Sequence, residues 1–228
     1  MTISKSLPYS STIKFGPKLH PAPSDIEGLP TKEDIESYPV MFTWEELKKI
    51  IKIGDLALLK RPKQLQKIYD EWSLKMKADF GGSTESYLLN KRVFFVDKSS
   101  PKPDESFDRS TPESRFCIIA NDWPYSTPRS VTHFLIWTPL PLVSKSQMTP
   151  EIEQDGVTGF TGVEGDEKGG IRGKEGDVRW EMGMFVNDRW NPDDCETIWF
   201  LNPPRLQSVK LLPHYHVFAR RKSQPTVD

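Results

Sequence analysis

The sequence has few cysteines and no surplus of charge. Its 228 residues include only two cysteines, Cys117 and Cys195, which are too few for a disulfide framework. Both lie in apolar, strand-like surroundings, so we expect reduced, buried thiols and a cytoplasmic or nuclear location. The 31 basic residues are balanced by 32 acidic ones, whereas binding to nucleic acid needs a basic surplus or stripe. Nucleic acid is therefore not an expected partner.

Long apolar runs are also absent. No run of about 18 apolar residues occurs, so neither a membrane span nor a membrane partner is expected. The N-terminal stretch MTISKSLPYSSTIKF lacks the apolar centre of a signal peptide. Aromatic residues, by contrast, are plentiful, and the seven tryptophans and twelve phenylalanines predict a folded core. The 20 prolines indicate that some segments lie outside that core.

The distribution of proline, glycine and apolar residues predicts one domain with loose ends. Residues 1–40 are rich in proline and lack periodicity, which is typical of an extended arm that is poorly ordered or wraps the domain. Residues 41–221 are expected to form a single domain, and residues 222–228 a tail. Within the domain, residues 97–114 predict a polar loop without core-forming side chains. Residues 156–176 contain eight of the fourteen glycines and predict a flexible insertion.

Five segments have the apolar spacing or the capping residues of helices. Thr43 and Glu46 match a capping box, in which the hydroxyl and the carboxylate each accept a backbone N–H of the other residue. Gly54 suits the end of that helix. The other four helices are expected from Pro62 to the glycine pair at 81–82, at 85–92, from Thr149 onward and at 177–190.

Four strands are expected from their alternating or β-branched and aromatic composition, at 115–120, 131–139, 196–202 and 208–221. The first two are predicted to form a hairpin with a wide loop, NDWPYSTPRS. Helices come first, then a hairpin, then helices, then two strands. This order predicts an α+β fold with a mostly antiparallel sheet and flanking helices rather than an alternating βαβ fold.

Three of the four histidines fall in these strands. His214 and His216 are two residues apart, so their side chains are expected on the same side of the last strand. They could be a nucleophile and its helper, half of a metal site, or hydrogen-bonded structural residues, as could His133. A metal would need His133 and Asp122 or Asp188 as further ligands, and no spacing specifies such a set, so no metal or cofactor is expected.

Several motifs resemble a fungal family of unknown function whose named member is the N-acetylglucosamine-induced protein. These are FTWEELKKII, NDWPY, VTHFLIWTP and LQSVKLLPHYHV, and the similarity covers residues 40–220 or so. Where the family usually has glycine after NDWPY, this chain has Ser126. The resemblance implies a fungal intracellular protein with a link to amino-sugar metabolism, and it implies no particular reaction.

A more distant resemblance is to the histidine-triad superfamily of nucleotide hydrolases and transferases, whose fold is therefore an expectation for this chain. The residues that carry it, in chain order, are Asn121, Pro124, His133, Gln207, Ser208, Val209, His214 and His216. The chain departs from the superfamily in three ways. One extra residue separates Val209 from the histidine pair. The first histidine of the triad is replaced by Leu212 or Pro213, and a phosphate-approaching glycine is replaced by Leu206.

The superfamily implies a role for each of these residues. His214 would attack the α-phosphate of a nucleotide or a nucleotide-linked sugar, and His216 would assist it. Ser208 would stabilise the developing charge. The substrate-binding residues would be Asn121, His133 and Gln207. The alternatives are a non-catalytic binding or regulatory protein that retains the fold, and a histidine metalloenzyme. In each case except the last, the expected partner is a small phosphate, nucleotide or amino-sugar ligand.

Overall fold

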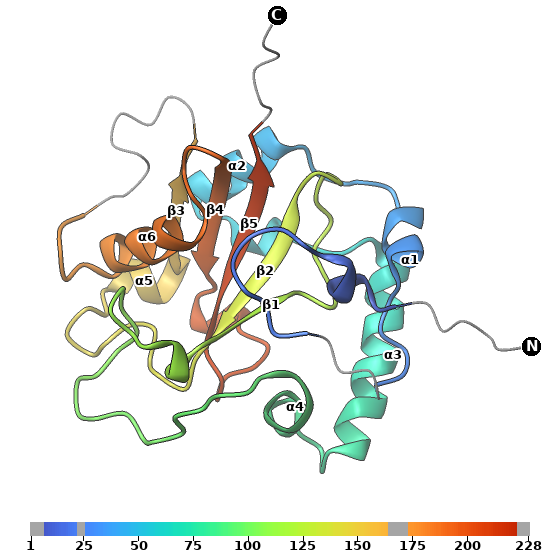
Figure 1. The fold of residues 1–228 in the computed structure, drawn as a ribbon, viewed down its shortest axis with the longest axis horizontal. Helices are drawn as coiled ribbons and strands as arrows, with labels where there is room; N and C mark the ends of the chain where they lie inside the picture. Colours follow the sequence, from blue (N-terminus) through green and yellow to red (C-terminus); the bar gives the residue numbers. More distant parts are fainter. Residues whose placement is uncertain (1–6, 22–25, 164–172, 223–228) are drawn as a thin grey trace, which may run out of the picture.

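A computed structural model describes residues 7–21, 26–163 and 173–222. It shows a five-stranded antiparallel sheet with helices on both faces, so the predicted α+β fold is confirmed (Figure 1). The strands, in the spatial order β1-β2-β5-β4-β3, are β1 (Cys117–Ala120), β2 (Thr132–Trp137), β5 (His214–Arg221), β4 (Cys195–Leu201) and β3 (Val157–Thr161). The helices of the described part are α1 (Lys32–Ser37), α2 (Trp44–Ile53), α3 (Lys63–Asp79), α4 (Thr84–Tyr87), α5 (Pro150–Asp155) and α6 (Val178–Arg189).

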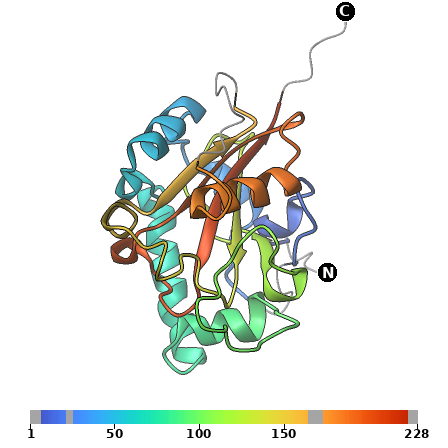
Figure 2. The same cartoon turned by 90° about the vertical axis from the view of Figure 1, so that its left-hand side faces the viewer.

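Alternation along the strands divides the core into two layers. On β5, Tyr215 and Val217 face the layer that also contains Phe185 of α6. Phe218 faces the opposite layer, together with Leu47 of α2, because successive side chains of a strand point to opposite faces. Figure 2 shows the sheet between these two layers, with α2 and α3 on one side and α6 on the other. The histidines of β2 and β5 therefore lie on the α2 and α3 side.

Local signals explain where the helices begin and end. Thr43 and Glu46 form the predicted capping box at the start of α2, and Gly54 ends the helix in the left-handed conformation with φ of 77°. The α3 helix begins directly after Pro62 and ends just before the predicted glycine pair. The segment 85–92 is a short α-helix that continues into π-helix η3 (Leu88–Arg92). The hairpin of β1 and β2 is also confirmed, because the two strands pair antiparallel.

Two loops differ from expectation. Part of the glycine-rich segment, Val157–Thr161, forms edge strand β3 and pairs with β4, whereas residues 164–172 of that segment lie outside the described residues. The strand forms there because Gly159 leaves room for the large indole of Trp199. The polar loop at 97–114 does contribute a core residue, since the buried ring of Phe107 packs against both Phe116 and Phe185.

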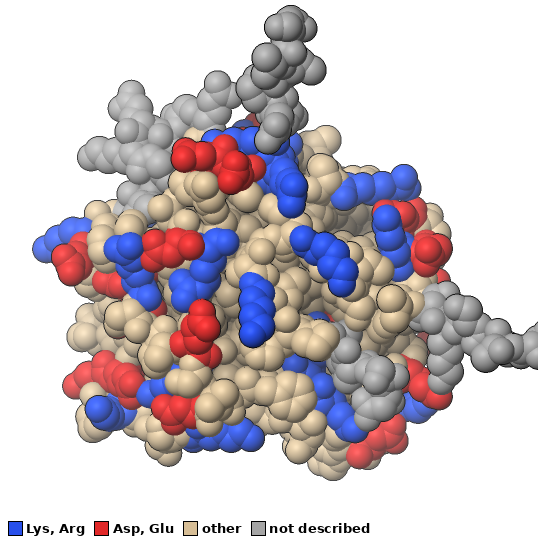
Figure 3. Space-filling model, in the orientation of Figure 1, with Lys and Arg blue, Asp and Glu red and all other residues tan. Residues whose placement is uncertain are grey.

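The described part of the arm lies against the sheet on the α6 side. Phe15 contacts Phe134 of β2, with ring centroids 6.2 Å apart, and the backbone N–H of His20 donates to the carbonyl of Ile118. On the face that carries the arm, basic and acidic side chains are interspersed (Figure 3). No helix of the described residues is long and apolar enough to cross a membrane.

A buried ion pair ties the arm to the loop that follows β1. Arg92 has 1% of its side chain exposed, and its Nε and Nη2 atoms donate to the carboxylate of Asp122 at 2.7 and 3.1 Å. Its Nη1 atom donates to the carbonyls of His20 and Pro21. From the arm, the Ser10 hydroxyl donates to the same carboxylate. One arginine therefore connects η3, the arm and the loop that carries Asn121.

Candidate histidine site

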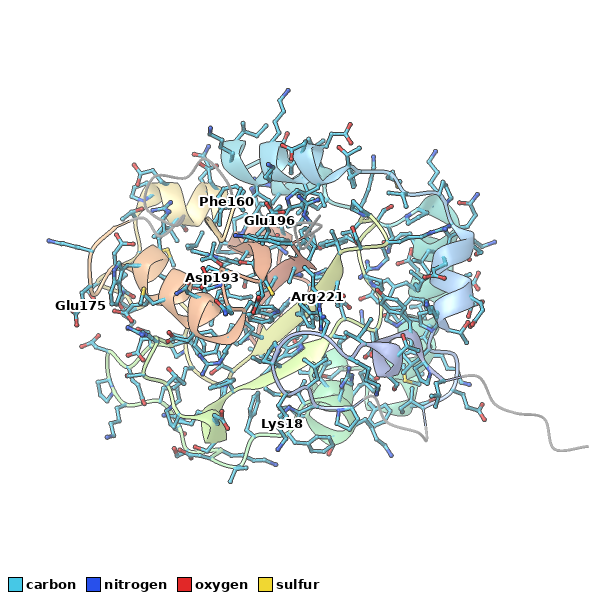
Figure 4. All side chains as sticks on the ribbon, turned by 45° about the horizontal axis from the view of Figure 1, so that its top comes forward. Lys18, Phe160, Glu175, Asp193, Glu196 and Arg221 are labelled. Atoms are coloured by element: carbon cyan, nitrogen blue, oxygen red, sulfur yellow. The ribbon has the colours of Figure 1, made fainter. Side chains whose placement is uncertain are left out.

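A cavity of about 280 Å³ lies between the sheet, α3 and α4. We call it the histidine cavity, because His214 and His216 form its sheet wall. The remaining walls are largely aromatic, and their rings are Tyr69, Trp72, Tyr87, Trp123, Tyr125 and Trp137. The cavity is at the start of β5, at the opposite end of the sheet from Glu196 and Arg221, which are labelled in Figure 4. Its combination of aromatic walls with several polar groups that converge on one space is typical of a small-molecule site.

His133 occupies the centre of a hydrogen-bonded group behind the cavity. The backbone N–H of Tyr125 donates to Nδ1 of His133 at 3.2 Å. The Asn121 amide nitrogen lies 3.3 Å from the same atom, and its oxygen already accepts the N–H of Trp123. Since Nδ1 is an acceptor, the proton of neutral His133 is on Nε2. That Nε2 atom lies 2.9 Å from Nδ1 of His216, to which it donates.

The same reasoning assigns the position of the ring proton of His216. Because its Nδ1 accepts, neutral His216 has its own proton on Nε2. That nitrogen lies 3.2 Å from the side-chain nitrogen of Asn202, and two donors cannot share a hydrogen bond. The amide of Asn202 is thus expected to turn about its Cβ–Cγ bond and present its oxygen. The His216 ring is held between Phe200, with ring centroids 4.6 Å apart, and Tyr125, with centroids 5.7 Å apart.

His214 has the opposite proton arrangement. Its Nδ1 lies 3.4 Å from the backbone carbonyl of Leu212, which is an acceptor only, so Nδ1 has the proton. Nε2 of His214 is therefore unprotonated, and it has no hydrogen-bond partner among the described residues. The ring lies over the indole of Trp137, with centroids 4.0 Å apart. The cavity wall thus presents the lone pair of Nε2 of His214, and the contact with Trp137 holds this ring in place.

Burial keeps all three imidazoles neutral. It lowers the pKa of His214 to about 4, because a charged ring would lose its hydration. Burial also lowers the pKa of His133 and of His216 well below the ordinary value of 6.5, with smaller contributions from Arg61 and from the other histidines. At neutral pH, His214 is thus a base with a free lone pair rather than a cation.

One basic side chain lines the histidine cavity. The guanidinium of Arg61 lies 4.2 Å from the ring centroid of Tyr69, and its Nε donates to the carbonyl of Trp123. Its Nη1 donates to Gln66, whereas Nη2 has no hydrogen-bond partner among the described residues. The one carboxylate of the lining, Asp122, is already paired with Arg92. The cavity therefore has an excess of one positive charge.

Comparison with known proteins identifies the family. Residues 43–220 match the family described as "Protein of unknown function (DUF3605)". The chain belongs to this family. All residues that line the histidine cavity lie within the matched range, so the cavity is part of the family domain.

Two individual proteins are similar to this member of the family. The "Uncharacterized protein YPL067C" of Saccharomyces cerevisiae is 27% identical over 181 residues, which cover 76% of each chain. The solved structure "Crystal Structure of HTC1" has a TM-score of 0.48 and 22% identity, and the match covers 78% of this chain and 85% of that chain.

The structure brings most of the predicted site residues together. Asn121, Ser208, His214 and His216 all line the histidine cavity. His133, which was expected to bind the ligand directly, is fully buried behind His216, and both of its ring nitrogens face protein atoms. His133 therefore lies behind the cavity wall, where it contacts His216, and is not itself a lining residue.

Gln207 is also placed differently from expectation, because its side chain donates to the backbone carbonyl of Asn202 at 2.8 Å and does not line the cavity. Arg61, Asn202 and Trp137 line the cavity and were not predicted from the sequence. Asn202 ends one predicted strand and Trp137 lies near the end of another, which was the available signal. Nothing in the local sequence distinguished Arg61 from other surface arginines.

The carboxylates considered for a metal site have other partners. Asp122 pairs with Arg92 in the core. Asp188 pairs with Arg109 at 2.7 Å on the surface of α6. Within the described ranges, no group of three or more histidine, cysteine, aspartate or glutamate side chains could hold a metal ion. The donor set therefore does not support the metalloenzyme alternative.

Proposed function

We propose that the histidine cavity binds a small phosphodiester, such as a dinucleotide or one diester unit of a nucleotide-linked sugar, and that His214 attacks its phosphorus. One observation carries this proposal. Of the two histidines that line the cavity, only His214 has an unprotonated ring nitrogen, Nε2, that accepts no hydrogen bond from the described residues. A neutral, oriented imidazole is a competent nucleophile, whereas the protonated ring is not.

The reaction would proceed in two steps. The Nε2 lone pair of His214 forms a bond to phosphorus while the bond to the leaving oxygen breaks. That oxygen departs with the electron pair and takes a proton from water. A water molecule then attacks phosphorus, loses its proton to solvent, and the N–P bond breaks, which restores neutral His214. The carbonyl of Leu212, which accepts the Nδ1–H of His214, stabilises the positive charge that the ring acquires in the intermediate.

The charge and the walls of the cavity favour a diester over a terminal phosphate. A diester has one negative charge, which matches the single unpaired cation, Arg61, whose Nη2 is free to donate. A terminal phosphate has a charge of about −1.5 to −2 at pH 7 and would leave part of it unpaired. The ring faces of Trp72 and Trp123 provide surfaces on which a base or a sugar ring could stack.

The test compares wild type with His214→Ala on a panel of nucleotides, dinucleotides and nucleotide-linked sugars, including amino sugars. We expect turnover with wild type and a loss of at least about a thousandfold in the variant, as for removal of a nucleophile. Acid-free quenching followed by mass spectrometry should detect a nucleotidyl group on the peptide that contains His214. The matched control is His20→Ala, a histidine that does not line the cavity. Equal turnover in wild type and His214→Ala would refute the nucleophile assignment.

A second function, binding without reaction, is favoured by the aromatic walls and by the absence of a first triad histidine. The same ligand panel in a thermal-shift assay separates the two. A ligand that raises the melting temperature without being consumed indicates a binding protein, because stabilisation needs only preferential binding to the folded state. Replacement of Arg61 by methionine should then abolish the shift, whereas replacement of the neighbouring, exposed Lys60 by methionine should not.

A further inference from the structure

A second cavity, of about 260 Å³, lies beneath the N-terminal arm and is separate from the histidine cavity. We call it the arm cavity. Residues 9–15 of the arm form one wall, and α1 with the residues just after it, also within the arm, forms another. The third wall is the loop from Pro124 to Thr132, and Pro62 and Leu65 complete the lining. Residues from three distant parts of the chain thus converge on one space, which makes it a candidate for a ligand site.

Charge around the arm cavity is predominantly positive. Its basic side chains are Lys14, Lys32 and Arg129, and its one carboxylate is Glu36. Lys32 lies 3.7 Å from Glu36 on the exposed surface of α1. That pair leaves Lys14 and Arg129 without a carboxylate partner among the described residues. Two uncompensated cations beside one cavity favour an anionic ligand.

Two hydroxyl groups could complete the recognition of an anion. Neither the Tyr9 hydroxyl nor the Thr132 hydroxyl has a hydrogen-bond partner among the described residues. Burial, with a contribution from Glu36, raises the pKa of Tyr9 to about 12, so its hydroxyl keeps its proton and is a donor at all physiological pH values. A donor that stays neutral beside cations is suited to bind phosphate or carboxylate oxygens.

Most of the other lining residues are apolar, although Thr12, Ser126 and Thr127 also contribute hydroxyl groups. The apolar and aromatic residues are Ile13, Phe15, Ile35, Tyr38, Pro39, Val40, Pro62, Leu65, Pro124, Tyr125, Pro128 and Val131. Proline side chains lose little conformational entropy when a ligand covers them. A free inorganic ion would leave these surfaces uncovered, so the lining fits an anion that also has an apolar body.

The two cavities share one wall. Tyr125 lines both of them. Arg61 and Trp123 line the histidine cavity, whereas the adjacent residues Pro62 and Pro124 line the arm cavity. The Tyr125 ring is also stacked on His133, with centroids 5.2 Å apart. A ligand in the arm cavity would therefore contact the residue that supports the histidine group.

We infer that the arm cavity is a binding site for a small organic anion, a phosphate monoester or a carboxylate attached to an apolar group. This site is distinct from the proposed phosphodiester site and does not depend on it. The basic side chains attract the anionic group, the Tyr9 and Thr132 hydroxyls donate to its oxygens, and the proline-rich walls cover the apolar part.

The test is calorimetric titration of the full chain with phenyl phosphate, benzoate and inorganic phosphate at low salt. We expect one molecule of phenyl phosphate or benzoate to bind more tightly than inorganic phosphate, and its affinity to fall as salt is added. The difference in affinity between phenyl phosphate and benzoate shows whether the site prefers a phosphate or a carboxylate. In the double variant Lys14→Ala/Arg129→Ala, the affinity should fall at least tenfold, and in Tyr9→Phe several-fold.

Controls separate this site from the histidine cavity. Lys67→Ala removes an exposed cation on α3 that does not line the arm cavity and should leave the affinity unchanged. His214→Ala should also bind the probe as wild type does. Binding that survives in the double variant and is lost in His214→Ala would place the probe in the histidine cavity and overturn the inference, as would no binding of either aromatic probe. Lys14 and Arg129 are exposed, so the variants should keep the melting temperature of wild type.

Discussion

At the scale of single residues, the neutral histidines make stability depend on pH. Burial lowers the pKa of His214 to about 4, whereas in the unfolded chain a histidine titrates near 6.5. Between these two pH values the unfolded state binds more protons than the folded state. The contribution of neutral His214 to stability is therefore complete above about pH 6.5 and is lost as the pH falls. We expect His214 to lower the free energy of unfolding by up to about 1.4 kcal/mol per pH unit between about pH 6 and its folded pKa of about 4.

The variant His214→Phe keeps the stacking on Trp137 and removes one titrating group. Urea unfolding at pH 7.5, 6.0 and 5.0 should show a shallower dependence on pH for the variant than for wild type. Carboxylates titrate in both proteins and cancel in the comparison. Identical slopes would show that the folded protein takes up a proton on His214 near pH 6.

At the scale of elements, edge strand β3 depends on one glycine. A Cβ atom at Gly159 would collide with the indole of Trp199 on the adjacent strand β4, and that indole is fully buried. We expect Gly159→Ala to lower the free energy of unfolding by about 1–3 kcal/mol, as an overpacked core does. Urea or thermal unfolding followed by tryptophan fluorescence measures this change.

The neighbouring substitution Thr158→Ala is the control for β3. Thr158 is half-buried on the opposite face of the strand, so the loss should stay below about 0.5 kcal/mol. If Gly159→Ala were as stable as Thr158→Ala, the close contact between β3 and β4 would not limit the size of residue 159.

At the scale of the whole molecule, the Arg92–Asp122 pair joins the arm to the family domain. Replacement of Arg92 by leucine would leave the carboxylate of Asp122 buried without its cation, and would remove two hydrogen bonds to arm carbonyls. We expect a loss of about 3–5 kcal/mol in the free energy of unfolding. Limited proteolysis should also cleave the variant faster than wild type within residues 7–21, because the arm would detach more often.

The double variant Arg92→Leu/Asp122→Leu tests whether the unpaired charge of Asp122 causes the loss of stability in Arg92→Leu. It has no unpaired buried charge, so it should recover part of the stability lost by Arg92→Leu. Equal losses in the single and double variants would assign the effect to packing rather than to the charge of Asp122. Both variants should become more sensitive to protease in the arm, since neither donates to the carbonyls of His20 and Pro21.

The sequence by itself determined the class of fold and most element boundaries. Caps, prolines and alternation are local signals, which is why α2, α3, α6 and the β1–β2 hairpin were predictable. The pair His214 and His216 was also placed on one face, because the strand period of two requires it. Strand β3 was not predicted, since its glycines suggested flexibility, and the contact with Trp199 that requires Gly159 is more than thirty residues away in sequence.

Only the tertiary structure decided what surrounds the histidines. The ring protons are assigned along a chain of contacts from Tyr125 and Asn121 through His133 to His216, and the last contact requires the pairing of β2 with β5, strands about 80 residues apart. The burial of His133 and His216 follows from that pairing. The position of Arg61 follows instead from its contact with the carbonyl of Trp123, more than sixty residues away in sequence. Local sequence cannot encode these features, because hydrogen bonding and desolvation depend on atoms that folding alone brings within a few ångströms.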